Sequence, residues 1–145
     1  RATELIRNYN IEVPFVKTTR IQVTDIAKAR GFIKTILGRR ARVTQEMRDN
    51  KKEYSMFSRL IQGSAADLLK KAMVDCYEAG VFNVLIPHLT VHDELDSSVP
   101  KTKEGKEAFN EKKFIMENCI KIKVPITADL EIGDNWGQLR KHDPK

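Results

Sequence analysis

A long amphipathic helix dominates the sequence, and it is predicted over about residues 53–79. Small and apolar side chains recur there at steps of three and four positions: Ile61, Ala65, Leu68, Leu69, Ala72, Met73 and Cys76. Gly80 follows this run and predicts its end. Gly63 lies inside it and weakens a helix by about 1 kcal/mol relative to alanine, so we expect a bend or a close backbone approach there.

The segment before this helix predicts a second helix, a strand and a loop. Pro14 suits the first turn of a helix, and Gly31 suits its end. Residues 32–37 are typical of a strand, which a glycine turn and the very basic stretch 38–42 follow. Residues 41–53 are polar, and we expect them to form a loop.

The segment after it predicts a hairpin, a helix and a strand. Residues 82–91 and 95–99 are β-like runs, with Pro87 expected at an edge or bulge. Residues 102–119 predict an amphipathic helix, and residues 122–132 alternate as a half-buried strand does. The amphipathic series of that helix is Ala108, Lys112, Ile115 and Cys119. The expected fold is α+β, with an antiparallel sheet that holds the hairpin and the last strand and has helices on one face.

Charge is unevenly distributed along the 145 residues. Residues 1–60 hold 14 Lys/Arg and 6 Asp/Glu, a balance of +8, whereas the whole chain carries +6 and the remainder therefore −2. A basic region followed by a mildly acidic one fits a phosphate-binding surface beside a carboxylate cluster, and equally fits a solvated basic surface. Cys76 and Cys119 are predicted to be buried free thiols. No apolar run approaches the length of about 20 residues that a membrane span needs.

The triplet His92-Asp93-Glu94 lies between the two strands of the predicted hairpin. Adjacent carboxylates repel each other, and a bound cation relieves that repulsion. Mg²⁺ takes oxygen ligands, often one or two carboxylates together with substrate phosphates. Taken alone, the triplet is more often an exposed acidic turn than a metal site.

The stretch from Gln62 to Asp67 places four small residues in a row inside the long helix. Small residues allow another backbone or a bulky ligand to come close, and Gln62 offers a donor and an acceptor. Ser58 lies four residues earlier on the same helix face. Tight helix packing with an incidental glutamine explains the stretch equally well.

Four segments together resemble family A DNA polymerases, in the order and at about the spacing of that family. They are GFIKTILGRR, IQGSAADLLKKAM, VHDEL and the closing stretch from MENC through VPITADLEIGDNW. VHDEL is similar to the motif C of the family. The resemblance covers roughly residues 10–140. It implies a palm lobe, in which residues 1–52 connect fingers and palm and residues 53–145 form the palm core.

The resemblance also implies roles for individual residues. Asp93 would ligate the catalytic Mg²⁺, and Glu94 would be the neighbouring catalytic acid. His92 would reach the primer end. Gln62, with Ser58 beside it, would contact the minor groove, whose acceptors are nearly independent of sequence. Arg39 and Arg40 would bind DNA phosphates, and a structural ion pair is the alternative for either one. The implied partners are primer–template DNA and deoxynucleoside triphosphates.

The sequence departs from the family in three respects. Ser58 and Tyr54 stand where the family has Asn and Arg, and Pro87 is unexpected in the first hairpin strand. The first catalytic aspartate and the fingers helix have no counterpart. We therefore expect a segment of a longer or split polymerase that needs the remaining parts as a partner and is inactive alone.

Two alternatives remain beside this interpretation. One is a non-catalytic DNA-binding fragment or a subunit of a split polymerase. The other is a metal hydrolase of the His-Asp type, for which only His88, His92 and His142 are available. We expect a location in the bacterial or phage-infected cytoplasm or in an organelle, without a membrane partner.

Overall fold

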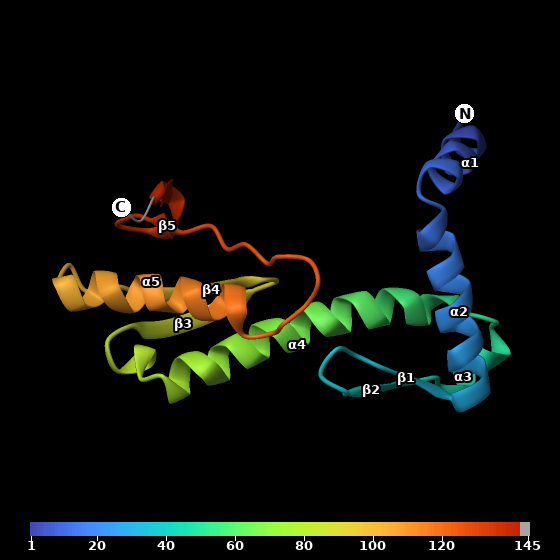
Figure 1. The fold of residues 1–145 in the computed structure, drawn as a ribbon, viewed down its shortest axis with the longest axis horizontal. Helices are drawn as coiled ribbons and strands as arrows, with labels where there is room; N and C mark the ends of the chain where they lie inside the picture. The colour runs from blue at the N-terminus through green and yellow to red at the C-terminus, as the bar shows by residue number, and fades with distance from the viewer. Residues whose placement is uncertain (143–145) are drawn as a thin grey trace. The chain divides into compact units, whose positions relative to one another are not determined.

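The computed structural model describes residues 1–142 and contains two compact units, of which the second begins at Leu68. The first unit contains α1 (Ala2–Glu12), α2 (Pro14–Arg30), β1 (Phe32–Lys34), β2 (Arg40–Arg42), α3 (Gln45–Asp49), the 3₁₀ helix η1 (Glu53–Ser55) and the first part of α4 (Met56–Glu78). The second contains the rest of α4, η2 (Val81–Asn83), β3 (Ile86–Val91), β4 (Glu94–Ser98), α5 (Lys103–Asn118), β5 (Glu131–Ile132), η3 (Trp136–Gln138) and β6 (Arg140–Lys141) (Figure 1).

In the first unit, α2 begins and ends where the sequence predicts. Pro14 occupies its first turn, and Gly31 ends it with a φ of 75°, a left-handed conformation that suits glycine. The core of this unit joins α2, β1, α3 and α4. Its buried side chains are Val23, Ala27, Ile33, Met47 and Met56.

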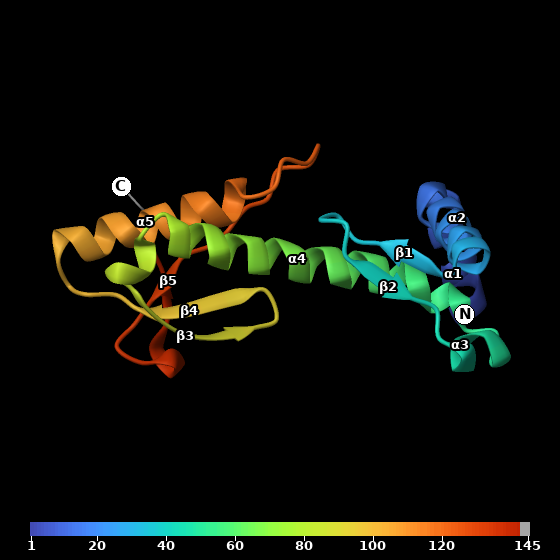
Figure 2. The same ribbon diagram turned by 90° about the horizontal axis from the view of Figure 1, so that it is seen from below.

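The strand predicted over 32–37 is shorter than expected, because the chain turns back after Lys34. β1 and β2 form a three-pair antiparallel hairpin in which Ile33 faces Ala41. Thr35 N–H donates to the Arg39 carbonyl, and Gly38 has a φ of 85° in the connection. The hairpin runs beside the first part of α4 (Figure 2).

The loop predicted over 41–53 is wrong in part, since this stretch contains the end of β2, the short helix α3 and the start of η1. The Thr44 side chain accepts a hydrogen bond from Met47 N–H at 3.2 Å and so caps α3. Met47 is buried in the core, and it alone anchors a helix of otherwise polar residues. One apolar residue in five leaves no periodicity for sequence analysis to detect.

The long helix is confirmed as α4, which begins slightly later and ends one residue earlier than predicted. The chain leaves it at Gly80, whose φ of 76° again is left-handed. Helix α5 also matches its prediction, and the Thr102 side chain caps it by accepting from Gly105 N–H at 3.1 Å.

In the second unit, α5 runs alongside the β3–β4 hairpin (Figure 1). Cys76, Val81, Leu85, Phe109 and Leu130 form its buried core. Both cysteines are free, as predicted, although Cys119 is only partly buried. Burial raises the pKa of Cys76 to about 11, so its thiol stays protonated at neutral pH.

The strand predicted over 122–132 is wrong except at its end. Only Glu131 and Ile132 form a strand, β5, which pairs with β6. Val124 is 68% exposed despite its place in the alternation. The Ala128 N–H donates to the Glu117 carboxylate at 2.9 Å instead of to a neighbouring strand. Alternation of apolar residues therefore did not suffice, because a strand also needs an adjacent strand edge to pair with.

The expected α+β class with small antiparallel sheets is confirmed. The described sheets have two strands each, so the hairpin β3–β4 and the last strand do not share one sheet as predicted. Among residues 1–142, no helix has both the length and the apolar character that crossing a membrane requires.

Replacing Gly105 by alanine should destabilise the second unit. Gly105 is buried in the first turn of α5, and a Cβ there would lie well inside van der Waals contact with the Pro100 carbonyl oxygen. Overpacking of this kind costs about 1–3 kcal/mol, which outweighs the gain of about 1 kcal/mol in helix propensity. Lys106→Ala at the exposed neighbouring position is the control, and chemical denaturation measures both. Equal stability of the two variants would contradict this packing.

Candidate active site and nucleic-acid interface

The predicted acidic hairpin is confirmed, and it places Asp93 at its tip. Val91 pairs with Glu94, so His92 and Asp93 are the two turn residues. The register shifts between Pro87 and Leu89, which is the bulge that Pro87 predicted. The two-residue turn therefore places the three residues of the triplet together at the end of the hairpin.

His92 has a φ of 55°, which is unusual for a residue other than glycine. Such a conformation costs on the order of 1–3 kcal/mol and persists only where the surrounding structure enforces it. The pairing of β3 with β4 supplies that constraint, since it closes the chain over two residues. Two-residue hairpin turns of types I′ and II′ require a positive φ at their first residue, so the turn itself accounts for this conformation of His92.

The side-chain oxygens at this turn are of the type that Mg²⁺ binds. Asp93 and Glu94 are adjacent, exposed carboxylates, and neither forms an ion pair with another side chain of residues 1–142. Carboxylate oxygens are ligands that Mg²⁺ prefers. In the described part of the chain, no group of three or more His, Cys, Asp or Glu side chains is arranged to hold a metal ion. A complete metal site at this turn would therefore need ligands from outside the described residues.

A buried lysine supports the acidic strand, and sequence analysis did not assign it a role. Lys112 Nζ donates to the Leu95 carbonyl and to Ser97 Oγ, each at 2.8 Å. Both acceptors belong to β4, which begins at Glu94. The available signal was the place of Lys112 in the amphipathic series of its helix, where an apolar residue would be expected.

In the first unit, Gln62 and Ser58 are exposed on α4, four residues apart. This spacing places both side chains on the same helix face, as the sequence predicts. Tyr54 is 59% exposed and belongs to the 3₁₀ helix η1, one turn before α4 begins. The polar groups of Gln62 and Ser58 are thus available to a ligand.

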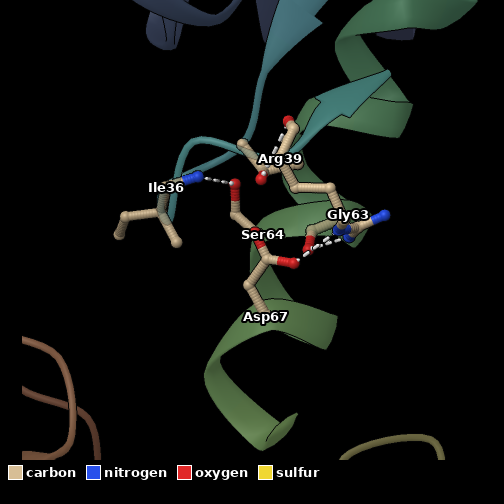
Figure 3. Close-up of polar contacts among 6 residues, drawn as sticks. Ile36, Arg39, Gly63, Ser64 and Asp67 are labelled. Atoms are coloured by element: carbon tan, nitrogen blue, oxygen red, sulfur yellow. Dashed lines mark hydrogen bonds and ion pairs between the residues drawn. The ribbon is translucent and has the colours of Figure 1, made fainter. Parts of the chain in front are cut away.

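The small residues of α4 receive the connection between β1 and β2 (Figure 3). Arg39 Nε donates to Asp67 Oδ1 at 2.7 Å, and its Nη2 donates to the Gly63 carbonyl at 2.8 Å. Ile36 N–H donates to Ser64 Oγ at 3.1 Å. We call these three contacts the hairpin anchor.

Gly63 is required by this close approach, as its sequence position predicts. A Cβ there would lie 2.9 Å from Thr35 Cγ2 and 3.3 Å from Arg39 Nη2. The structure thus shows the tight-packing alternative for the Gln62–Asp67 stretch, because the hairpin occupies the space beside the glycine.

Asp67 is the buried member of the ion pair, with its side chain 5% exposed against 50% for Arg39. Burial alone would raise its pKa, but the Thr35 hydroxyl, the Arg39 guanidinium and the Leu37 N–H together lower it below the ordinary value of 3.8. Asp67 is therefore ionised at neutral pH, and Arg39 has the structural ion pair that sequence analysis gave as its alternative role.

Arg40 differs from Arg39, because it lies at an exposed position of β2. Its guanidinium carbon is 4.8 Å from the centroid of the Phe32 ring, which is a cation–π contact. This contact orients the guanidinium and leaves its N–H donors at the surface. Of the two predicted phosphate-binding arginines, Arg40 is thus the less engaged by the protein.

The sequence profile of DNA polymerase family A matches residues 1–138. The chain belongs to DNA polymerase family A. A DNA-directed DNA polymerase of Pseudomonas phage M6 is 40% identical over 134 residues, 92% of this chain. DNA polymerase theta of Drosophila melanogaster is 36% identical over 140 residues, and DNA polymerase I of Chloroflexus aurantiacus is 31% identical over 148.

A solved structure of the family resembles the fold of this chain. It is the POL domain of Pol1 from M. smegmatis in complex with DNA primer-template and dNTP. The two agree with a TM-score of 0.72 and 30% identity over 86% of this chain and 23% of that one. The chain spans 19% of the phage polymerase, 7% of polymerase theta and 15% of the Chloroflexus enzyme.

The hairpin anchor leads to a prediction about acid stability. Arg39→Met should destabilise the first unit by on the order of 1–3 kcal/mol at neutral pH, because it leaves a buried carboxylate without its charged partner. The folded-state pKa of Asp67 is lowered, so its stabilising contribution is present above 3.8 and is lost as pH falls through the folded-state pKa. The stability gap between wild type and variant should therefore shrink in acid.

Denaturant titrations at neutral pH and at pH about 3 measure this gap. Arg42→Met, at an exposed position of β2, is the matched control and should change little at either pH. A gap for Arg39→Met that stays constant with pH would contradict the assignment of the ion pair.

Proposed function

We propose that this chain is the part of a DNA-directed DNA polymerase that carries the second carboxylate turn of the active site. The observation behind this proposal is the two-residue hairpin turn that presents Asp93 and Glu94, in a chain that matches the family profile over residues 1–138. The reaction is the templated transfer of a nucleotide to a primer. The primer 3′-oxygen forms a bond to the α-phosphorus of a deoxynucleoside triphosphate, the α–β phosphoanhydride bond breaks, and pyrophosphate leaves.

Members of this family use divalent metal ions. In this chain Asp93 is the proposed Mg²⁺ ligand, and Glu94 is the supporting acid beside it. Bound Mg²⁺ supplies charge stabilisation for the attacking and leaving oxygens of phosphoryl transfer. The first catalytic aspartate and the fingers helix come from outside this chain, so the chain alone is inactive in this proposal.

The DNA contacts divide by chemistry. His92, on the same turn as Asp93, contacts the primer end. Gln62 and Ser58 present donors and acceptors to the minor groove, where acceptors are nearly the same for every base pair. Arg40 binds a backbone phosphate, while Arg39 fixes the hairpin that carries Arg40 and has further N–H donors for phosphate. These partners follow the solved relative, which holds primer-template and dNTP.

The placement of the chain within the polymerase is part of the same proposal. Residues 1–52 connect fingers and palm, residues 53–145 form the palm core, and the other parts of the enzyme join them in cis or as a separate chain. The enzyme works on DNA in the bacterial or phage-infected cytoplasm or in an organelle. A split polymerase or a DNA-binding fragment is the second candidate, favoured by the basic charge of residues 1–60.

Asp93→Asn in the complete polymerase tests the metal role. The change keeps the shape of the side chain and removes a metal ligand, so primer extension should fall by at least about 100-fold while primer–template affinity changes less than about 2-fold. Asp96→Asn, the same change further along the hairpin, is the control and should retain most activity. Extension by Asp93→Asn within about tenfold of wild type would exclude Asp93 as a ligand.

The phosphate role of Arg40 has a salt-dependent signature. Arg40→Gln should weaken binding to all duplex sequences alike and reduce the slope of log K against log salt by about 0.9, the contribution of one phosphate contact. Fluorescence anisotropy of the complete polymerase over a salt series measures the slope. Lys106→Gln removes the same charge from an exposed position of α5 and should leave the slope unchanged. An unaltered slope for Arg40→Gln would give Arg40 a structural role through Phe32.

A further inference from the structure

Lys112 is the most deeply buried lysine of the described residues, with 4% of its surface exposed. Burial of an ammonium group is costly unless hydrogen bonds or charges compensate for the lost water. Its position on α5 would accept an apolar side chain, since Phe109 beside it is a core residue. The presence of a charge at this position therefore needs an explanation beyond core packing.

Three contacts compensate for the burial of the Lys112 ammonium, and two of them are hydrogen bonds to residues of β4. Nζ donates to the Leu95 carbonyl and to Ser97 Oγ at 2.8 Å each, and it lies 5.1 Å from the centroid of the Phe109 ring. Burial lowers the pKa of Lys112, and the negative charge of Asp96 opposes that shift. The side chain thus joins the middle of α5 to one strand of the acidic hairpin.

The joined strand is the one that carries the acids. Leu95 directly follows Glu94, and its side chain is buried, so both its backbone and its side chain are held on the α5 side. Successive side chains of a strand point to opposite faces, so Leu95 and Ser97 share the face toward Lys112 while Glu94 lies on the other. The pairing of Val91 with Glu94 then fixes the turn residues relative to this anchored strand.

We propose that Lys112 is a positioning residue for the Asp93–Glu94 turn, which it holds in the geometry that metal binding needs. This inference rests on the proposed polymerase function. Lys112 touches neither metal nor substrate in this proposal. It acts through the Leu95 carbonyl and the Ser97 hydroxyl, in the way that hydrogen-bonded partners of metal ligands orient those ligands.

A purely structural role predicts a different outcome for Lys112→Met. Methionine has a similar length and suits the apolar surroundings, but it offers no donor to Leu95 or Ser97. If Lys112 only filled space, this variant would be as stable as wild type and fully active. If Lys112 positions the turn, the variant loses metal affinity and turnover while the DNA contacts, which lie on other residues, remain.

The experiment uses the complete polymerase with Lys112→Met, Ser97→Ala, Lys106→Met and Asp93→Asn. Binding of Mn²⁺ to the complex with primer–template is measured by electron paramagnetic resonance, together with kcat, KM for nucleotide, primer–template Kd and thermal unfolding. Lys112→Met should weaken Mn²⁺ binding and lower kcat by about 10- to 100-fold, with primer–template Kd within about 2-fold of wild type. Lys106→Met removes an exposed lysine of the same helix and should match wild type.

Ser97→Ala keeps the lysine and removes one acceptor, so a smaller loss of Mn²⁺ affinity is expected in a protein that folds as wild type does. If Lys112→Met does not fold, the Mn²⁺ affinity of Ser97→Ala tests the positioning role instead. Wild-type Mn²⁺ affinity and kcat in folded Lys112→Met, or in Ser97→Ala when the methionine variant is unfolded, would overturn the inference. Full activity of Asp93→Asn would instead overturn the proposed function itself, whatever the lysine variants do.

Discussion

A charged side chain that leaves water must find a partner, and this requirement organises both compact units. In the first unit the buried charge is Asp67, and Arg39 reaches it from the β1–β2 connection at 2.7 Å. In the second it is Lys112, which reaches the backbone of β4 at 2.8 Å. In each unit the buried charge joins a hairpin to a helix. Each hairpin has only two strands, so these polar contacts, together with buried side chains such as Ile33 and Leu95, fix where each hairpin lies on its helix.

The acidic turn shows the opposite arrangement. Asp93 and Glu94 are exposed, and His92 has a left-handed backbone that costs free energy. None of these features favours folding. The rest of the hairpin and the core beneath Leu95 compensate for them. Two adjacent exposed carboxylates without an ion pair among the described residues are available to a cation, and this availability supports the polymerase proposal.

Sequence analysis succeeded where one local signal decides the structure. The helices α2 and α4 have periodic apolar faces and end at glycines with left-handed φ, and the bulge follows from the proline at position 87. It failed where a second segment decides. Residues 122–132 alternate well, but only Glu131 and Ile132 pair with another strand, and the Glu117 carboxylate accepts a hydrogen bond from the Ala128 N–H instead. The short helix α3 was missed because a single buried methionine holds it.

The candidate site divides in the same way. By itself, the sequence determined the identity of the acids at the hairpin turn, the exposed pair Ser58 and Gln62, and the resemblance to family A polymerases, because these depend on residue types at short spacings. Only the tertiary structure decided that Arg39 pairs with Asp67 and that Lys112 supports β4. The members of these contacts lie 28 and 17 residues apart along the chain. A charged residue in a sequence does not reveal whether water or a distant partner will surround it, and that choice is made only when the chain packs.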